Sequence, residues 1–241
     1  MLNHLDLFSG IGGFSLGLES TGGFRTTAFC EIDPYCQKVL NKHWPDVPIY
    51  NDIRNFEHDG KIDIVTGGFP CQPFSLAGDR KGQDDDRHLW PAMLAVIEKY
   101  RPTWVIGENV FGFISLGLDR CETDLEAIGY TVRTFDIYSC AADLPTLERH
   151  VWIVATPNDI GQQGIWQKEI QKFTRVPREF SGSYTGEIGR WNLPETRVCG
   201  VGERIPNRMD RLKCLGNAVD PRIPEMFGHY ILNVEKTLLT R

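Results

Sequence analysis

Short apolar runs alternate with amphipathic stretches through the first 155 residues, and this alternation limits the possible folds most strongly. The apolar runs predict strands at 2–7, 25–31, 62–67, 104–107, 131–137 and 151–155. Helical periodicity predicts helices at 14–19, 34–43, 89–100 and 119–128. Asp33-Pro34 predicts an N-cap followed by proline at the first position of the second helix, and Pro102 ends the third. Strands that alternate with helices form a parallel-rich sheet covered on both faces. We therefore predict an α/β fold with a mixed, mostly parallel sheet.

The regular pattern stops near residue 155 and returns only close to the end of the chain. Residues 156–205 are rich in Gly, Pro, Gln, Arg and aromatic side chains and show little periodicity, which predicts a small irregular lobe. Regularity resumes at residue 206 and ends in a helix over 224–238. We divide the chain accordingly into a main domain at 1–155, a small lobe at 156–205 and a C-terminal segment at 206–241.

Composition excludes several classes of protein. No apolar run approaches the roughly 20 residues that span a bilayer, and the first residues lack a basic region followed by an apolar stretch. The seven cysteines are scattered, without CxxC spacing, and the six histidines form no ligand-spaced cluster. We therefore expect a cytoplasmic protein with no membrane span, no disulfide framework and no metal site.

Charge is distributed unevenly along the chain. The net charge is −6, but residues 168–222 hold eleven Lys or Arg against seven Asp or Glu, a local excess of +4. A basic segment in an otherwise acidic protein is typical of an enzyme that contacts phosphate groups with one face. A solvated charged surface explains the same pattern equally well.

A glycine-rich turn follows the first strand and opens the first helix, as a nucleotide-type ligand site requires. Its candidate ligand-binding residues are Phe8, Ser9, Gly10, Gly12 and Gly13. Glycines let the backbone approach a ligand, and a helix N-terminus favours negative charge. A simple tight turn between strand and helix remains the alternative.

Two acidic side chains stand at the ends of the next strands. Glu31 can accept both hydroxyls of a ribose. Asp52 can accept from an adenine amino group while Ile53 packs on the ring, although a turn or helix-cap role fits Asp52 as well. Together with the glycine turn they favour an adenosine-containing ligand. The sequence has neither GxGxxG nor a Walker lysine, so NAD and ATP are less favoured.

Two further residues can carry chemistry. Cys71 lies between Pro70 and Pro73, just beyond a strand that ends in Gly-Gly, and such a loop is not ordinary core. Glu108 comes at the mouth of the neighbouring strand, where partial burial lets a carboxyl group hold a proton near neutral pH. Taken singly, Cys71 is more simply interpreted as a buried structural cysteine and Glu108 as a salt-bridged glutamate.

Four motifs together resemble those of the bacterial and phage DNA (cytosine-5) methyltransferase family. They are DLFSGIGGF at 6–14, GGFPCQPFS at 67–75, ENV at 108–110 and RLKCLGNAV at 211–219. The resemblance covers nearly all of 4–155 and 206–232 and leaves only the insert unmatched. It implies a Rossmann-like S-adenosylmethionine-dependent fold and transfer of a methyl group to C5 of cytosine in double-stranded DNA. A role in restriction-modification and a monomeric enzyme are further expectations.

The resemblance also implies roles for the matching residues. The S-adenosylmethionine site would comprise the turn residues named above with Glu31, Ile32, Asp52, Ile53, Pro70, Asn217, Ala218 and Val219. The last three would close it as the C-terminal segment folds back on the main domain. Cys71 would add to C6 of a flipped-out cytosine, so that C5 can attack the methyl group, while Glu108 donates to N3.

DNA contacts are expected from two places. Gln72, Ser75 and Arg87 belong to the loop after the cysteine, which would contact DNA when closed. The insert would be the target-recognition region, and its candidate DNA-binding residues are Arg175, Arg178 and Arg190. Arginine suits bidentate reading of guanine, although more than half of the insert's arginines should contact phosphate or nothing.

The chain departs from the family pattern just before the strand at 151–155. The usual Gln-x-Arg-x-Arg becomes Thr146, Glu148 and His150, and a register shift would make Arg149 the residue that holds the flipped base. Asp220 also replaces a usually apolar residue. A DNA-binding relative that no longer methylates is therefore one alternative. A tRNA cytosine-5 methyltransferase is another, disfavoured because the Cys-Phe-Thr tripeptide of that branch is absent.

Overall fold

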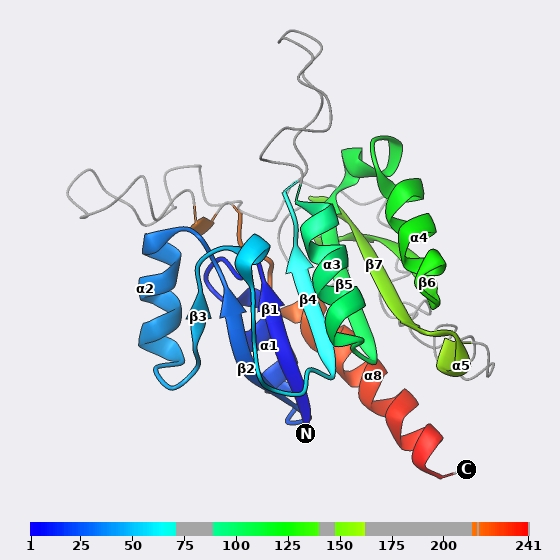
Figure 1. The fold of residues 1–241 in the computed structure, drawn as a ribbon, viewed down its shortest axis with the longest axis horizontal. Coiled ribbons are helices and arrows are strands. Elements are labelled where there is room, and N and C mark those ends of the chain that lie inside the picture. The colour runs from blue at the N-terminus through cyan, green and yellow to red at the C-terminus, as the bar shows by residue number, and fades with distance from the viewer. Residues whose placement is uncertain (71–88, 140–147, 162–213, 216, 241) are drawn as a thin grey trace, which may run out of the picture.

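The computed structural model describes residues 1–70, 89–139, 148–161, 214–215 and 217–240, and these form a seven-stranded sheet with helices on both faces (Figure 1). The strands are β1 (Leu2–Leu7), β2 (Phe24–Cys30), β3 (Ile49–Tyr50), β4 (Ile64–Gly68), β5 (Trp104–Val110), β6 (Tyr130–Tyr138) and β7 (Arg149–Pro157). Their order is β3-β2-β1-β4-β5-β7-β6. The pairs from β3 to β5 are parallel, whereas β7 runs antiparallel to both β5 and β6. The mixed, mostly parallel sheet predicted from the sequence is confirmed.

The helices begin and end close to the predicted positions. They are α1 (Gly13–Ser20), α2 (Pro34–His43), α3 (Trp90–Tyr100), α4 (Leu118–Ala127), α5 (Asn158–Gly161) and α8 (Arg222–Leu239), with 3-10 turns η1 (Ile53–Asn55) and η2 (Phe111–Ser115). At the start of α2, the Asp33 carboxylate accepts hydrogen bonds from the Tyr35 and Cys36 amides, and Pro34 takes the first helical position. This cap satisfies N–H groups that otherwise have no intrahelical partner.

Two apolar cores lie on opposite faces of the sheet. On one face, α3 and α4 cover side chains such as Val65, Val105 and Ile153. On the other face, α1 and α8 cover a second cluster that includes Trp104 and Trp152. Figure 1 shows α3 and α4 in front of the strands and α8 behind them. Strands buried on both faces explain why the apolar runs in the sequence are nearly continuous.

The C-terminal segment packs against α1 at very short range. A Cβ atom at Gly13 would lie 2.1 Å from the carbonyl oxygen of Val219, and one at Gly17 would lie 2.0 Å from that of Pro221. Only glycine permits this approach of two backbones. The N-terminal glycine motif therefore also serves as the docking surface for a segment about 200 residues later in the chain.

The structure differs from the sequence prediction in three elements. The two-residue strand β3 was missed because its length carries no periodicity. Glu108 lies within β5, which continues to Val110, rather than beyond the strand. β7 ends at Pro157 and α5 follows it, so regular structure extends past residue 155. Most of the predicted lobe at 156–205 lies outside the described residues.

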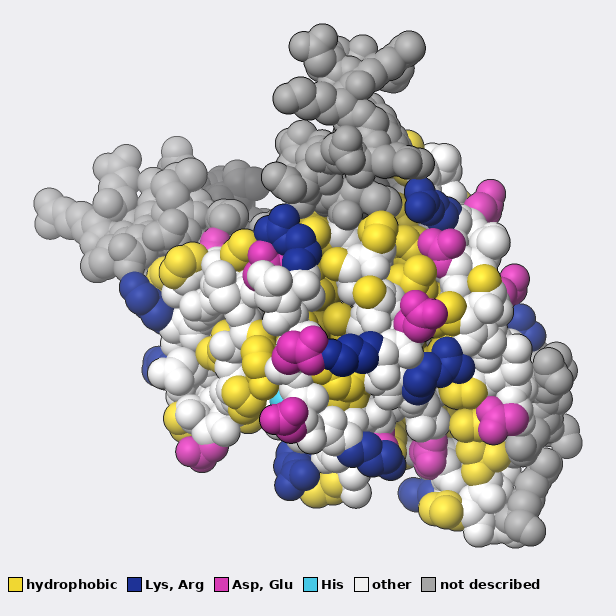
Figure 2. Space-filling model, in the orientation of Figure 1, with side chains coloured by type: hydrophobic (Ala, Val, Ile, Leu, Met, Phe, Trp, Pro, Cys, Tyr) yellow, Lys and Arg dark blue, Asp and Glu magenta, His cyan; other side chains and the backbone are white. Residues whose placement is uncertain are grey.

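The described surface carries both signs of charge. Figure 2 shows lysine, arginine and acidic side chains interspersed over the face that includes α3 and α4. The most basic segment, 168–222, lies largely outside the described residues. Within the described part of the chain, no helix has the length and apolar character needed to cross a membrane.

Candidate active site

The carboxyl ends of β1, β2, β4 and β5 meet at one edge of the sheet, where open α/β folds place their ligands. Leu7 pairs with Cys30 on one side and with Gly67 on the other, and Gly68 pairs with Glu108. This register places the glycine turn, the β2 end, the start of the Cys71 loop and Glu108 side by side. The sequence motifs that lie far apart along the chain therefore converge on a single site.

The turn after β1 has an unusual backbone. Phe8, Gly10 and Gly12 adopt positive φ values of 52°, 54° and 89°. The Ser9 hydroxyl donates to the Asp6 carbonyl oxygen at 2.6 Å, and Gly12 forms the start of α1. Among the residues that the structure describes, and apart from the two neighbours in the chain, no atom lies within 4 Å of the position that a Cβ would take at Gly10. The turn thus leaves open space in front of a helix N-terminus, which suits a bound ligand.

Glu31 links this turn to the beginning of α2. Its Oε2 accepts from the Gly10 amide and its Oε1 from the Asp33 amide, both at 2.7 Å. Burial raises the pKa of the Glu31 carboxyl, and hydrogen bonds from the Asp33, Gly10 and Ile32 amides oppose that effect. A carboxylate has about four lone-pair sites, so it can still accept from a ligand hydroxyl. The neighbouring Ile32 is 62% exposed.

Asp52 and Ile53 lie at the end of β3. The Asp52 carboxylate caps η1 by accepting from the Arg54 amide, and it forms an ion pair with the Arg54 guanidinium at 2.8 Å. Hydrogen bonds from Arg54 lower the pKa of this carboxyl. Ile53 is buried in the core beside η1. The cap role considered for Asp52 is present in the structure, and its contact with adenine stays a prediction.

Glu108 carries a largely buried carboxyl group near the carboxyl end of β5. Its side chain is 15% exposed, and burial raises its pKa to about 7. One carboxyl oxygen lies only 3.0 Å from the place that a Cβ would take at Gly68, so the glycine makes room for it. A carboxyl group with this pKa can give or take a proton at neutral pH.

The segment that leads to Cys71 is held by Asn109, the residue that follows Glu108 in β5. The Asn109 amide group donates to the Phe69 carbonyl oxygen at 2.9 Å. Pro70 is exposed at the end of this segment. Cys71 itself lies outside the described residues, as do the predicted DNA-binding residues Gln72, Ser75, Arg87, Arg175, Arg178 and Arg190.

The C-terminal segment reaches the same edge. Asn217 is exposed, Ala218 and Val219 are half-buried, and a Val219 methyl group would lie 3.9 Å from a Cβ at Gly68. Asp220, which departs from the family pattern, accepts from the Arg222 amide at 3.0 Å and so stabilises the start of α8. The carboxylate that looked anomalous in the sequence has a structural function.

Arg149 and His150 leave β7 in opposite directions. The Arg149 guanidinium forms an ion pair with Asp136 and lies 3.7 Å from the centroid of the Phe111 ring. His150 instead faces Glu108, with 3.7 Å between Nε2 and Oε1. The catalytic role predicted for Arg149 stays a prediction, but the structure does not bring its side chain to Glu108.

Sequence reasoning missed a buried polar network beneath the glycine turn. Asp6 accepts hydrogen bonds from Ser15 at 2.8 Å and from Thr66 at 3.2 Å, and the His4 ring contacts Thr66 at 2.7 Å. All four side chains are fully buried. Burial raises the pKa of Asp6 to about 8 and lowers that of His4 to about 3. The signal in the sequence was a histidine and an aspartate at positions 4 and 6, two residues apart and so on one face of the first strand.

Two other features lie near α2. Asp33, Cys36 and Cys214 bring possible ligand atoms within 4.8 Å of one another, a cluster that spacing in the sequence did not indicate. The two sulfur atoms are 2.7 Å apart, and Asp33 already caps the helix.

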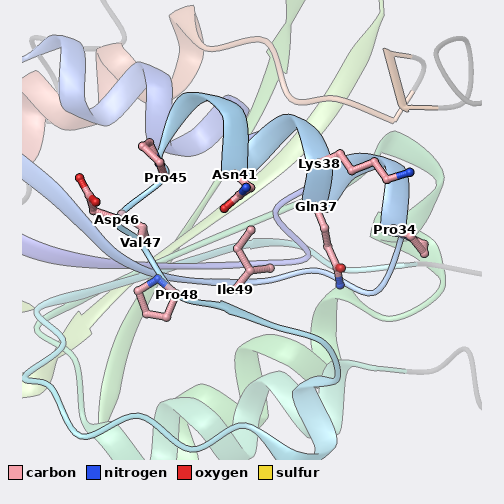
Figure 3. A pocket seen from close by; sticks show the side chains of 9 residues that line it. All are labelled: Pro34, Gln37, Lys38, Asn41, Pro45, Asp46, Val47, Pro48 and Ile49. Carbon is pink, nitrogen blue, oxygen red and sulfur yellow. The ribbon is translucent and has the colours of Figure 1, made fainter.

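An open hollow is lined by α2 and the segment from Pro45 to Ile49 (Figure 3). None of the predicted site residues lines this hollow.

The chain is similar in sequence to several known methyltransferases. Curated relatives include the type II methyltransferases M.AluI of Cellulosimicrobium cellulans, 42% identical over 84% of this chain and 40% of its own, and M2.BsuMI of Bacillus subtilis, 35% identical over 65% and 43%. The chain therefore spans less than half the length of either relative.

Solved structures share the fold. A Spodoptera frugiperda DNMT2 variant matches with a TM-score of 0.59 and 20% identity over 66% of this chain and 51% of its own. Schizosaccharomyces pombe Dnmt2 matches with a TM-score of 0.58 and 23% identity over 68% and 55%. The model of one family, the C-5 cytosine-specific DNA methylases, matches residues 2–188, which comprise the glycine turn, the cysteine loop and the Glu108 strand. The chain belongs to that family.

Proposed function

We propose that this protein transfers a methyl group from S-adenosylmethionine to C5 of cytosine in double-stranded DNA. The observation that carries the proposal is the Glu108 carboxyl, whose burial raises its pKa to about 7 at the sheet edge where the Cys71 loop begins. A carboxyl group held near its titration point at the edge of a sheet is a candidate for proton transfer. Membership of the methylase family supports the choice of reaction.

The residues at the edge suit the proposed cofactor. The positive-φ turn and the open space at Gly10 accommodate a ligand close to the backbone, and Glu31 offers lone pairs to ribose hydroxyls. Asn217, Ala218 and Val219 would close the site from the C-terminal side. When bound, S-adenosylmethionine supplies an electrophilic methyl group on a positively charged sulfur.

The chain's own groups prepare the pyrimidine. The Cys71 thiolate adds to C6 and breaks the C5–C6 double bond, while the proton of the Glu108 carboxyl moves to N3 and neutralises the charge that spreads into the ring. C5 then has the electron density to attack the methyl group. Loss of the C5 proton to water, departure of the thiolate and return of the N3 proton to the Glu108 carboxylate restore the aromatic ring and the starting state of both side chains. The base must first be flipped out of the duplex, because C6 is not accessible within the stack.

The decisive experiment combines an activity assay with a covalent trap. Full-length protein is incubated with S-adenosylmethionine and mixed-sequence DNA, and bisulfite sequencing identifies methylated cytosines. A duplex containing 5-fluorocytosine should give a stable protein–DNA adduct, because fluorine cannot leave as the C5 proton does. Cys71→Ser should abolish methylation and adduct, and Cys121→Ala, in the buried face of α4, is the matched cysteine control.

Three results would contradict the proposal. The first is methylation by the Cys71→Ser variant. The second is DNA binding without methylation by the wild-type protein, which would support the non-enzymatic alternative. The third is methylation of tRNA but not of DNA in a parallel incubation.

A further inference from the structure

Two cysteines that lie far apart in the sequence meet beside the candidate cofactor site. Cys36 is in the first turn of α2, and Cys214 belongs to the C-terminal segment, 178 positions later in the chain. Both are buried thiols in this structure, and their sulfur atoms are 2.7 Å apart. The other cysteines that the structure describes, Cys30 and Cys121, belong to the apolar core that α3 and α4 cover. The fold therefore makes Cys36 and Cys214 a pair of facing thiols.

The distance between the two sulfur atoms distinguishes the roles open to this pair. Two sulfur atoms that are not bonded stay at least as far apart as the roughly 3.5–4.0 Å of carbon contacts. A tetrahedral metal ion with sulfur ligands at about 2.3 Å would hold them about 3.8 Å apart. A covalent bond between them requires about 2.05 Å. The observed 2.7 Å is nearer to the covalent value, and Asp33, the third member of the cluster, is already engaged as the cap of α2.

The C-terminal segment is held at both ends of the short stretch that is predicted to close the cofactor site. At one end, the backbone at Val219 packs against Gly13 of α1. At the other end, Cys214 contacts α2. The Ala218 amide donates to the Leu215 carbonyl oxygen at 3.3 Å, so a tight turn joins the two ends. A covalent bond to α2 would therefore fix the position of the whole stretch.

We propose that Cys36 and Cys214 form an oxidation site, at which oxidised glutathione or a similar small disulfide converts the two thiols into a disulfide that fastens the C-terminal segment to α2. One thiolate attacks the oxidant and releases one glutathione, and the second attacks the resulting mixed disulfide and releases the other. Two electrons and two protons pass from the protein to one oxidised glutathione, which becomes two reduced molecules. The bond itself is independent of the proposed function, whereas its effect on the cofactor rests on that function.

Burial determines the order of these two steps. It raises the pKa of the Cys36 thiol, and the contact with Cys214 and the charge of Glu31 raise that pKa further. Thiolate is therefore scarce in the docked state, and neither sulfur is open to a molecule as large as glutathione. The mixed disulfide forms on Cys214 while the C-terminal segment is undocked, and docking then brings it to Cys36. Oxidation of the folded protein is accordingly slow.

The test uses full-length wild-type protein equilibrated in buffers with graded ratios of reduced to oxidised glutathione, then quenched with acid and alkylated. Peptide mass spectrometry should detect a peptide cross-linked between Cys36 and Cys214, in an amount that grows with the share of oxidised glutathione. Because the bond closes a long loop, the oxidised protein should melt about 5–10 °C above the reduced protein. It should also release S-adenosylmethionine several-fold more slowly, because the closing stretch cannot leave α2. Both forms have one sequence, so this comparison does not depend on the folding of a variant.

Cysteine variants assign the shift to this pair. Cys36→Ser and Cys214→Ser should each lose the difference in melting temperature between the two forms, whereas Cys121→Ala, a buried cysteine of α4, should keep it. The comparison is repeated in Cys71→Ser, where oxidation of the predicted nucleophile does not contribute.

The inference is overturned if no cross-linked peptide forms in the most oxidising buffer, or if the oxidised and reduced proteins melt at the same temperature. Stoichiometric zinc in the purified protein that is lost on substitution of either cysteine would assign the cluster to a metal and overturn it as well. A protein that forms the cross-link but neither methylates DNA nor gives the 5-fluorocytosine adduct would refute the proposed function alone, so the two failures are distinguishable.

Discussion

Asp6 offers a quantitative test of the buried network beneath the glycine turn. Burial raises the pKa of this carboxyl from 3.8 to about 8, although Ser15 and Thr66 donate to it. The folded chain therefore holds the proton more tightly than the unfolded chain does. Ionisation of Asp6 in the unfolded chain destabilises the fold above about pH 4, and this penalty grows by about 1.4 kcal/mol per pH unit. The penalty stops growing above pH 8, where the folded chain also loses the proton.

Asp6→Asn should remove this penalty while keeping the size of the side chain. Its amide and carbonyl can exchange hydrogen bonds with the two hydroxyl groups that contact Asp6. At pH 7, about three units above the unfolded pKa, the expected gain in the free energy of unfolding is on the order of 4 kcal/mol. Near pH 4 the variant should show no such gain.

Urea denaturation followed by tryptophan fluorescence between pH 4.5 and 9 measures this difference. The free energy of unfolding of the variant minus that of the wild type should rise with pH up to about 8 and then become constant. Asp46→Asn, an exposed change between α2 and β3, is the matched control. A pH-independent difference for Asp6→Asn would refute the assignment of a proton to this carboxyl.

Three other substitutions test the site and its support. Glu108→Gln should lower kcat by about 100-fold and remove the alkaline limb near pH 7 that deprotonation of Glu108 causes in the wild type, as measured by tritiated methyl transfer across pH 6–9. Gly13→Ala places a Cβ 2.1 Å from the Val219 carbonyl oxygen, so it should cost about 1–3 kcal/mol in urea and weaken cofactor binding in calorimetry. Leu16→Ala, on the exposed face of the same helix, is its control, and equal effects of the two would contradict the close-packing argument. Asp33→Ala should cost about 1 kcal/mol through loss of the α2 cap, and an unchanged melting temperature would count against that role.

Local signals in the sequence determined much of the fold. The alternation of apolar runs and helical stretches predicted the mixed sheet, and the Asp33-Pro34 pair predicted the start of α2. Positions that need glycine could also be predicted from the sequence, because Gly10, Gly12 and Gly13 in a turn after a strand indicate a close approach of the backbone to a ligand. These features depend on neighbouring residues only, so a single chain segment carries the information.

The tertiary structure alone decided which distant side chains meet. Alternation along β7 predicts that Arg149 and His150 point to opposite faces, but only pairing with β5 shows that His150 shares the face of Glu108. Register is set by long-range contacts and by burial of a whole face, so the sequence of one strand does not contain it. The same is true of the contact between Gly13 and the C-terminal segment, which joins residues about 200 positions apart. A cap or a turn is a local preference, whereas the composition of this active site follows from how the sheet is assembled.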